Sequence, residues 1–255
     1  MALSFDKIVL FGDSITQLAY QQQCGFCFGS AIQHAYCRKL DVILRGFGGY
    51  NSDHAAAIVD ALVQQETSEK SKIKLMVVFF GTNDSIIPES RNHVPVARFK
   101  DNLRYIISVG ERTGAKIVVV GPGPFNHYQF IDTQGDRFDC DRCTLRARQY
   151  CDAAMEVAEE CNVAAVPLWD LIMADLGWKE GDLIHGLPDG PAETPLNLYL
   201  NDGVHYLGKA YEVEFLNVIR AIKEHYPELD YERIPEKLPK WEDLTSVEVL
   251  KAAIE

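Results

Sequence analysis

The stretch IVLFGDSITQ, residues 8–17, sets an apolar run directly against Gly12, Asp13 and Ser14. The apolar residues predict a buried strand, and the small polar residues that follow predict a sharp turn into a helix. Four further runs are also apolar and rich in β-branched residues, and they span residues 41–46, 73–81, 115–123 and 162–169. Because these runs are nearly continuous rather than alternating, they indicate parallel strands that are covered on both faces.

Amphipathic stretches with helical spacing lie between the predicted strands. Three of them span residues 51–66, 96–114 and 144–161. Asn51 or Ser52 is suited to cap the first of these helices, and Gly114 is suited to end the second. Strands that alternate with helices predict a doubly wound α/β fold, a three-layer αβα sandwich around a parallel sheet.

The 255 residues are predicted to form one catalytic domain over residues 1–227, followed by a C-terminal appendage over residues 228–255. Residues 123–143 and 177–201 show little periodicity, and we expect them to form long loops that border a site. The appendage is charged and contains proline. The sequence leaves open whether it packs on the domain or makes a homodimer contact.

Composition and charge argue against several classes of partner. The chain has 37 acidic residues against 25 Lys and Arg, which gives a net charge of −12. Because nucleic acids and anionic membranes are bound by basic surfaces, we expect no nucleic-acid partner. No apolar run approaches the roughly 18 residues of a membrane span, and the N-terminus lacks the pattern of a signal peptide. These features predict a cytoplasmic protein with a small-molecule substrate and no membrane insertion.

The seven cysteines include two C-x-x-C pairs, Cys24 with Cys27 and Cys140 with Cys143. Structural zinc sites usually place two such pairs about 15–20 residues apart, and here they are much further apart. Free thiols in a reducing compartment are therefore the favoured interpretation. A metal or disulfide clip between the two loops stays open as the alternative.

Residues suited to nucleophilic catalysis follow the predicted strands. Ligands of open parallel sheets bind beyond the carboxyl ends of the strands, and there the sequence places Ser14, a glycine-rich stretch at residues 46–52, and Asn83. Asp202 and His205 stand three residues apart, a spacing that puts them on one face of a helical turn. In this arrangement His205 takes the proton of the Ser14 hydroxyl, and Asp202 orients the imidazole.

Three groups are candidates for an oxyanion hole, which binds the negative charge that develops on the substrate oxygen. They are the N–H of Ser14 at a helix start, the N–H of Gly49, and the side-chain amide of Asn83. Gly49 has no Cβ, so its backbone can approach a substrate closely. We expect Asp13 and Asp84 to support the loops rather than the reaction.

Four short blocks in this order resemble those of the GDSL, or SGNH, hydrolase superfamily. They are FGDSIT (11–16, with Ile15 where Leu is usual), GGYNS (48–52), GTNDS (81–85) and DGVH (202–205). The runs RGFGGYNSDHA and GPGP and a C-terminal W-x-D resemble the isoamyl acetate-hydrolysing esterase group of that superfamily. The resemblance implies the flavodoxin-like fold with a five-stranded parallel sheet, Ser14 as nucleophile, Asp202 and His205 as its partners, and Gly49 and Asn83 in the oxyanion hole. It implies no cofactor and no metal.

The sequence thus predicts a serine esterase that hydrolyses short-chain carboxylic esters, acetate esters above all, through an acyl-enzyme intermediate. An acyl-thioesterase, a lysophospholipase and a sugar-acetyl esterase are alternatives, because acyl length depends on pocket volume. A non-catalytic ligand-binding protein of the same fold is an alternative from another class. A dinucleotide site is disfavoured, because the G-x-G at Gly46–Gly48 is followed by Asn51 where the third glycine belongs.

Overall fold

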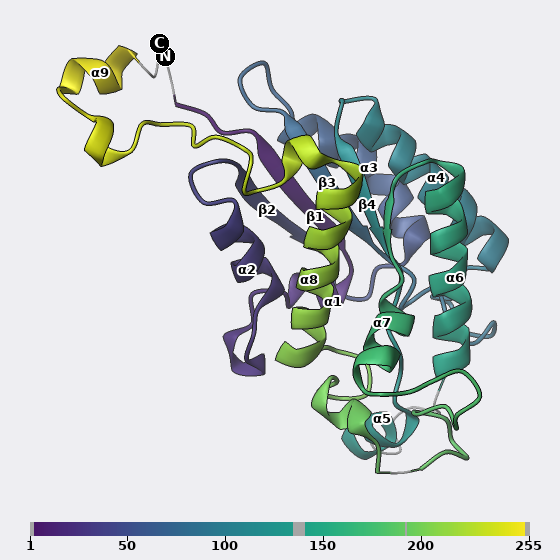
Figure 1. The fold of residues 1–255 in the computed structure, drawn as a ribbon. Coiled ribbons are helices and arrows are strands. Elements are labelled where there is room, and N and C mark those ends of the chain that lie inside the picture. Colours follow the sequence, from purple (N-terminus) through teal and green to yellow (C-terminus); the bar gives the residue numbers. More distant parts are fainter. Residues whose placement is uncertain (1–2, 135–140, 192, 253–255) are drawn as a thin grey trace.

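The protein, described here from a computed structural model covering residues 3–134, 141–191 and 193–252, is built around one parallel sheet (Figure 1). The strands are β1 (Lys7–Gly12), β2 (Asp41–Gly46), β3 (Ile73–Phe79), β4 (Lys116–Val120) and β5 (Ala164–Val166). Their order in the sheet is β2-β1-β3-β4-β5, and all four pairings are parallel. This order confirms the predicted five-stranded, doubly wound sheet.

Three strands end earlier than the sequence predicted. The apolar runs 73–81, 115–123 and 162–169 suggested longer strands than the structure has. Gly81 adopts a φ of +121°, and prolines follow β4 and β5, at Pro122 and Pro167. Since proline has no N–H to give to a sheet, these positions end the pairing and release the chain into loops.

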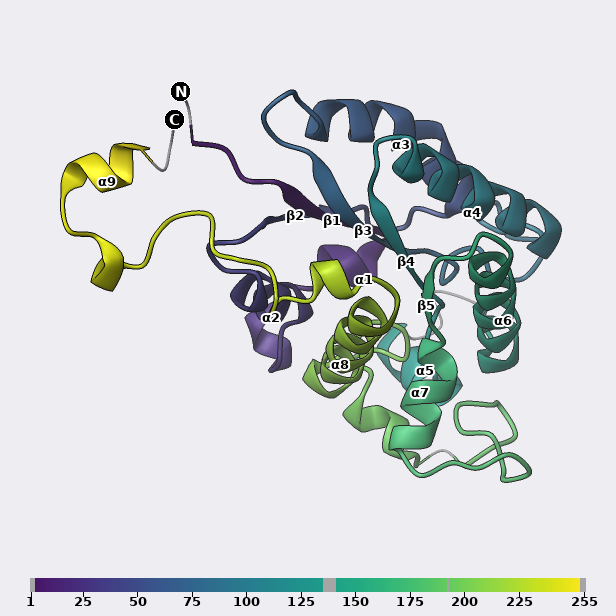
Figure 2. The same cartoon turned by 45° about the horizontal axis from the view of Figure 1, so that its top comes forward.

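Helices cover both faces of the sheet, as Figure 2 shows. The helices are α1 (Ser14–Gln17), α2 (Phe28–Ala35), α3 (Ser52–Glu66), α4 (Val96–Glu111), α5 (His127–Gln134), α6 (Thr144–Glu160), α7 (Leu168–Asp175), α8 (Gly208–His225) and α9 (Val247–Ala252). Helices α3, α4 and α6 lie on one face, and α1, α2, α7 and α8 lie on the other. Asn51 is the cap of α3, and Gly114 lies in the turn after α4 with a φ of +84°.

Side chains of the central strands alternate between two hydrophobic cores. Ile8 and Leu10 of β1 pack with α8, whereas Val9 and Phe11 pack with α3 and α4. All four are at most 1% exposed. Successive side chains of a strand point to opposite faces, so a strand covered on both faces needs an unbroken apolar run. This explains the run in residues 8–11.

One expected loop contains a helix. Residues 123–143 were expected to be irregular, but α5 forms within them after the buried Asn126, whose carbonyl accepts a hydrogen bond from the Phe130 N–H at 3.0 Å. Phe130 packs with Phe125 and Val204 in a small third cluster. This long-range contact, which local periodicity does not show, stabilises the short helix. In the described part of the other expected loop, 177–201, the regular structure is a 3₁₀ turn at Pro195–Leu198 and an isolated β-bridge from Leu200 to Tyr206.

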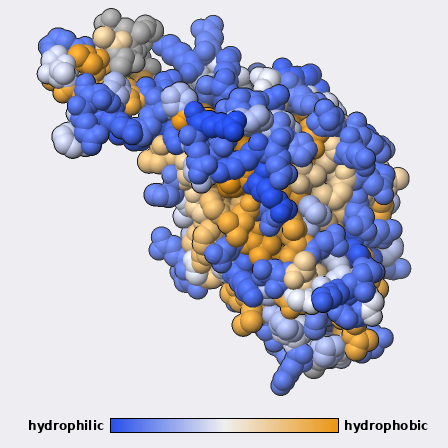
Figure 3. All heavy atoms as spheres, viewed as in Figure 1, coloured by the Kyte–Doolittle hydropathy of each residue, from blue (hydrophilic) through white to orange (hydrophobic). Residues whose placement is uncertain are grey.

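The C-terminal segment first lies against the domain and then leaves it. The Tyr36 hydroxyl donates to the Leu229 carbonyl at 2.8 Å, and Arg38 donates to the carbonyls of Leu238 and Pro239. From Trp241 onward an arm that includes α9 projects away from the sheet (Figure 1). On the domain itself, apolar side chains gather over α2 and α8 (Figure 3).

The six cysteines in the described part of the chain are all free thiols. Cys140 lies outside the described residues, so the clip between the two C-x-x-C pairs stays untested. Within residues 3–134, 141–191 and 193–252, no group of three or more His, Cys, Asp or Glu side chains is placed to hold a metal ion. In those same residues, every helix is too short or too polar to cross a bilayer.

Candidate active site

Ser14 is the first residue of α1, directly after the turn that follows β1. Asp13 caps the helix, and its Oδ1 accepts a hydrogen bond from the Ile15 N–H at 2.9 Å. A Cβ at Gly12 would lie 2.0 Å from Thr16 Oγ1 and 2.7 Å from the Phe79 carbonyl oxygen, so only glycine allows this tight turn. The N–H of Ser14, at the first position of the helix, has no acceptor within α1.

A continuous chain of hydrogen bonds joins Ser14 to Asp202 through His205. Ser14 Oγ lies 3.0 Å from His205 Nε2, and His205 Nδ1 lies 2.7 Å from Asp202 Oδ2. A carboxylate only accepts hydrogen bonds, so Nδ1 carries the proton and Nε2 is free to accept from the Ser14 hydroxyl. This is the tautomer that a general base for serine requires.

Asp202 stays ionised in this arrangement. Burial raises the pKa of its carboxyl group, but the His205 side chain and the N–H groups of His205 and Val204 outweigh burial and bring the pKa to about 2. Above about pH 4 the carboxylate is therefore available to orient the imidazole and to stabilise the imidazolium.

Asp202 and His205 meet in a bend rather than in the helical turn that their spacing suggested. Asp202 Oδ1 accepts hydrogen bonds from the N–H groups of Val204 at 3.0 Å and His205 at 2.8 Å, and these bonds close the bend. Gly203 has a φ of +86°, and a Cβ there would lie 2.4 Å from the Asn126 carbonyl oxygen. The turn chemistry of Asp and Gly therefore replaces the helix.

The predicted oxyanion groups lie at the same cavity as the triad. Gly49 adopts a φ of +78°, and within the described part of the chain its N–H makes no hydrogen bond. Asn83 is only 5% exposed, and its Nδ2 donates to the Tyr50 carbonyl at 2.9 Å. Ser14, Gly49, Asn83, Asp202 and His205 all line one cavity of about 480 Å³. Parallel topology thus brings together five residues that are up to 191 positions apart.

Sequence reasoning did not name the other side chains of the cavity wall, although residues 123–143, which were expected to border a site, supply three of them. The other lining residues are Ile86, Ser90, Arg91, Asn92, Phe130, Asp141, Arg142 and Val204. Arg142 is the most engaged of them, because its guanidinium donates to the Thr82 carbonyl at 2.7 Å and to Asn83 Oδ1 at 3.0 Å. The signal in the sequence was the position of Arg142 between the two cysteines of the second C-x-x-C pair, a motif that was considered only for its thiols.

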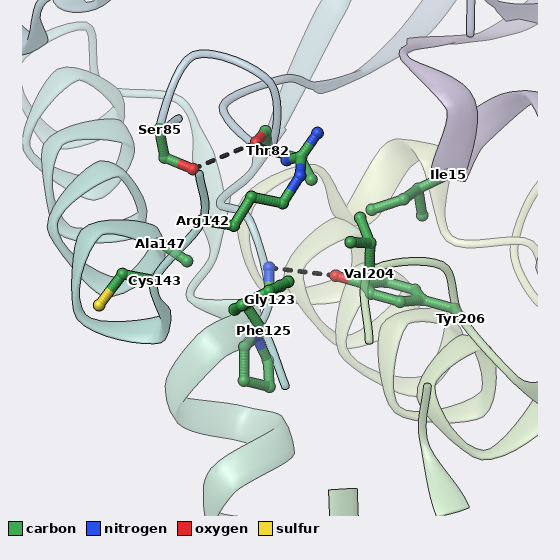
Figure 4. A pocket seen from close by; sticks show the side chains of 11 residues that line it. Ile15, Thr82, Ser85, Gly123, Phe125, Arg142, Cys143, Ala147, Val204 and Tyr206 are labelled. Carbon is green, nitrogen blue, oxygen red and sulfur yellow. Dashed lines mark hydrogen bonds between the residues drawn. The ribbon is translucent and has the colours of Figure 1, made fainter. Parts of the chain in front are cut away.

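A second, much smaller cavity of about 20 Å³ shares Arg142 and Val204 with the first (Figure 4). Ile15, Val204 and Tyr206 line it on one side, and Thr82 and Arg142 line it on another. The Tyr206 hydroxyl accepts a hydrogen bond from the Gly123 N–H at 3.0 Å. This volume is close to that of one water molecule, so it cannot hold an acyl chain.

Two buried carboxyl groups, those of Asp13 and Asp84, lie next to residues of the site. Burial raises the pKa of Asp13 to about 6 and that of Asp84 to about 7, and the nearby Asp13 charge adds to the effect on Asp84. Asp84 Oδ1 accepts from the Ser52 N–H at 2.9 Å, which links the loop after β3 to the start of α3. Both side chains hold loops, as their positions in the sequence suggested.

The GDSL-like lipase/acylhydrolase family model matches residues 10–213. The chain belongs to this family. It is a carboxylic ester hydrolase, and all four sequence blocks lie within or at the edge of the matched region. An isoamyl acetate-hydrolyzing esterase 1 homolog of Bos taurus is 30% identical over 95% of this esterase and 89% of that protein. The isoamyl acetate-hydrolyzing esterase of Saccharomyces cerevisiae is 27% identical over 95% of this esterase and 96% of that protein.

Solved structures share the fold of this esterase. An acetylxylan esterase from Geobacillus stearothermophilus superposes with a TM-score of 0.60 at 16% identity, over 87% of this chain and 96% of that chain. The structure of TesA superposes with a TM-score of 0.56 at 20% identity, over 86% and 99% of the two chains. These matches show that the chain shares the three-layer α/β fold of those structures.

Proposed function

We propose that this esterase hydrolyses short-chain carboxylic esters, acetate esters in particular, with Ser14 as nucleophile. The observation that carries the proposal is the hydrogen-bonded chain from Ser14 through His205 to Asp202. Two relatives named for hydrolysis of isoamyl acetate support the acetate ester. For the acetylxylan esterase with the same fold, variants with serine or aspartate replaced by alanine are described as catalytic mutants.

In the first half of the reaction Ser14 Oγ attacks the carbonyl carbon of the ester, and its proton passes to His205 Nε2. The carbonyl oxygen becomes an oxyanion, which accepts hydrogen bonds from the N–H groups of Ser14 and Gly49 and from the Asn83 amide. When the tetrahedral intermediate collapses, His205 gives the proton to the alcohol oxygen. The alcohol leaves and an acyl-Ser14 ester remains.

In the second half His205 takes a proton from water, and the hydroxide attacks the acyl carbon. The same three donors bind the second oxyanion. Collapse returns the proton from His205 to Ser14 Oγ and releases the carboxylic acid. Asp202 keeps its charge throughout and stabilises the imidazolium in both halves. This sequence requires no cofactor and no metal.

The cavity wall supports a short acyl group. Among the lining residues that the structure describes, Ile86, Phe130 and Val204 are the large apolar ones. A long acyl chain needs a much larger apolar surface, because each buried CH₂ contributes only about 0.8 kcal/mol. The polar remainder, including Ser90 and Asn92, favours a polar alcohol portion, so a sugar-acetyl ester is the second candidate substrate.

A series of p-nitrophenyl esters tests the proposal. We expect kcat/KM for acetate to exceed that for octanoate by about tenfold or more, since the described wall offers little apolar surface. Ser14→Ala should lower kcat roughly 10⁴-fold or more with unchanged circular dichroism. Ser30→Ala, an exposed serine of α2, is the matched control and should behave as wild type. Equal rates for wild type and Ser14→Ala would show that Ser14 is not the nucleophile.

We further propose that this esterase is cytoplasmic, with residues 1–227 as the catalytic domain and 228–255 as an appendage. Six free thiols are in keeping with a reducing compartment.

A homodimer is the proposed assembly. The projecting arm exposes Trp241 and Val247, and an apolar groove between α2 and α8 is lined by Phe26 and Phe215. Exposed apolar surface of this kind commonly marks a contact between chains.

A further inference from the structure

We propose that Arg142 is a positioning residue that holds the Asn83 amide in the orientation that the oxyanion hole requires. The inference rests on the proposed role of Asn83 as an oxyanion donor. Arg142 lies between α5 and α6 and is about 60 residues from the loop it contacts. Its guanidinium Nη1 donates to the Thr82 carbonyl at 2.7 Å, and Nη2 donates to Asn83 Oδ1 at 3.0 Å.

The chemistry of the guanidinium decides which end of the amide faces it. A guanidinium only donates hydrogen bonds, so the Asn83 atom that faces Arg142 is the oxygen. The amide NH₂ group therefore lies at the opposite end, where one of its hydrogens is given to the Tyr50 carbonyl at 2.9 Å. The amide is thus held at both ends, and the second hydrogen of Nδ2 is left for the substrate.

The charge of Arg142 adds to this effect. A cation hydrogen-bonded to the amide oxygen draws electron density from the nitrogen and makes its remaining N–H a stronger donor. The side chain is half-buried and borders both the larger cavity and the small one, where it extends toward Thr82 (Figure 4). The charge of Arg142 also opposes, without outweighing, the rise that burial causes in the pKa of Asp13.

A neighbouring arginine provides a matched control. Arg146, one helical turn further along, donates to the carbonyls of Ser85 and Asp141, both at 3.0 Å. It therefore ties the same loop to α6 without touching Asn83. If arginines matter here only because they hold the loop, the loss of either one will have the same effect. If Arg142 acts through the Asn83 amide, only its loss will reduce turnover.

The test is a double-mutant cycle on kcat and KM for p-nitrophenyl acetate. Removal of one oxyanion donor by Asn83→Ala should lower kcat about 10²- to 10³-fold. Arg142→Met, which keeps the aliphatic stem, should lower kcat about 10- to 100-fold with KM within about threefold. The double variant should fall within about threefold of Asn83→Ala, because Arg142 has no amide left to orient. Arg142→Lys should retain part of the activity, and Arg146→Met should stay within about threefold of wild type.

The outcomes separate this inference from the proposed function. If Asn83→Ala turns over like wild type, the oxyanion role of Asn83 is wrong and the inference falls with it. If Asn83→Ala is impaired and the double variant loses the product of the two single-variant reductions in kcat, Arg142 acts independently of Asn83. In that case only the inference is wrong. A raised KM with unchanged kcat would make Arg142 a substrate contact and would also overturn it. Should Arg142→Met not fold, the same cycle with Arg142→Lys decides between these outcomes.

Discussion

At the scale of single residues, the proposed oxyanion hole depends on backbone N–H groups that donate to no neighbouring carbonyl in the described part of the chain. Ser14 has such a group because it begins a helix, and Gly49 has one because of its backbone conformation. With a φ of +78°, Gly49 occupies a region that costs an L-residue roughly 1–2 kcal/mol. The proposed oxyanion hole thus needs a glycine for its backbone conformation and not for lack of space, since a Cβ at Gly49 would meet nothing within 4 Å.

Gly49→Ala is therefore expected to reduce catalysis through the backbone. We expect kcat for p-nitrophenyl acetate to fall at least about tenfold, as the strained residue turns its N–H away from the oxyanion. Gly114→Ala is the matched control, because Gly114 has a φ of +84°, has equally open surroundings and lies after α4. Both variants should lose about 1 kcal/mol of unfolding free energy. An equal loss of kcat in both would mean that strain, not the Gly49 N–H, affects turnover.

At the scale of elements, the start of α3 and the loop after β3 hold each other in place. Asn51 caps α3 by accepting from the His54 N–H, and its Nδ2 donates to the Asn92 carbonyl at 2.9 Å. Asp84 adds its hydrogen bond from the Ser52 N–H. These bonds fix the segments that carry Gly49 and Asn83 relative to each other. We therefore expect the contact between the start of α3 and the loop after β3 to set the spacing of the proposed oxyanion donors.

Asp84 should make stability depend on pH. Its pKa is raised from 3.8 to about 7 in the fold, so the folded state binds the proton more tightly than the unfolded state. This contribution is fully present below about pH 4 and is lost as the pH rises through about 7. The stability of the neutral Asp84→Asn variant relative to wild type should therefore rise between pH 5 and pH 8, by roughly 1–3 kcal/mol in urea unfolding.

The control for this experiment is Asp189→Asn, which removes an exposed carboxylate from the loop at residues 177–201. It should leave the difference in stability between pH 5 and pH 8 unchanged. Because Asp13 has a pKa of about 6, the unfolding free energy of Asp84→Asn should still fall somewhat between pH 5 and pH 8. If Asp84→Asn has the same unfolding free energy as wild type at both pH values, ionisation of Asp84 does not destabilise the fold.

At the scale of the whole molecule, a domain with two cores is followed by an arm outside both of them. The segment up to Pro239 is bound by Tyr36 and Arg38 of the domain. Beyond it Trp241 is 78% exposed and Val247 is 62% exposed. Side chains with so much accessible area add little to the stability of a single chain, because hydrophobic stabilisation scales with buried area.

A chain that ends at Pro239 should consequently keep its fold and lose its assembly. We expect its Tm to lie within about 2 °C of the full chain, compared at the same low protein concentration. Sedimentation should shift from a dimer to a monomer, and Trp241→Glu in the full chain should weaken the dimer in the same direction. A large drop in Tm would place the arm within the folded core. Unchanged sedimentation would show that any dimer forms elsewhere.

From the sequence alone we could predict the five strands, the long helices α3, α4 and α6, and the residue types of the site. Apolar periodicity and the chemistry of Gly12, Asp13 and Ser14 act over a few residues, so they can be read locally. Three features became visible in the folded chain alone: Asp202 and His205 meet in a bend, α5 forms against Val204, and Arg142 contacts Asn83. Each of these depends on contacts between segments tens of residues apart, or on a choice between helix and turn that the surrounding packing settles.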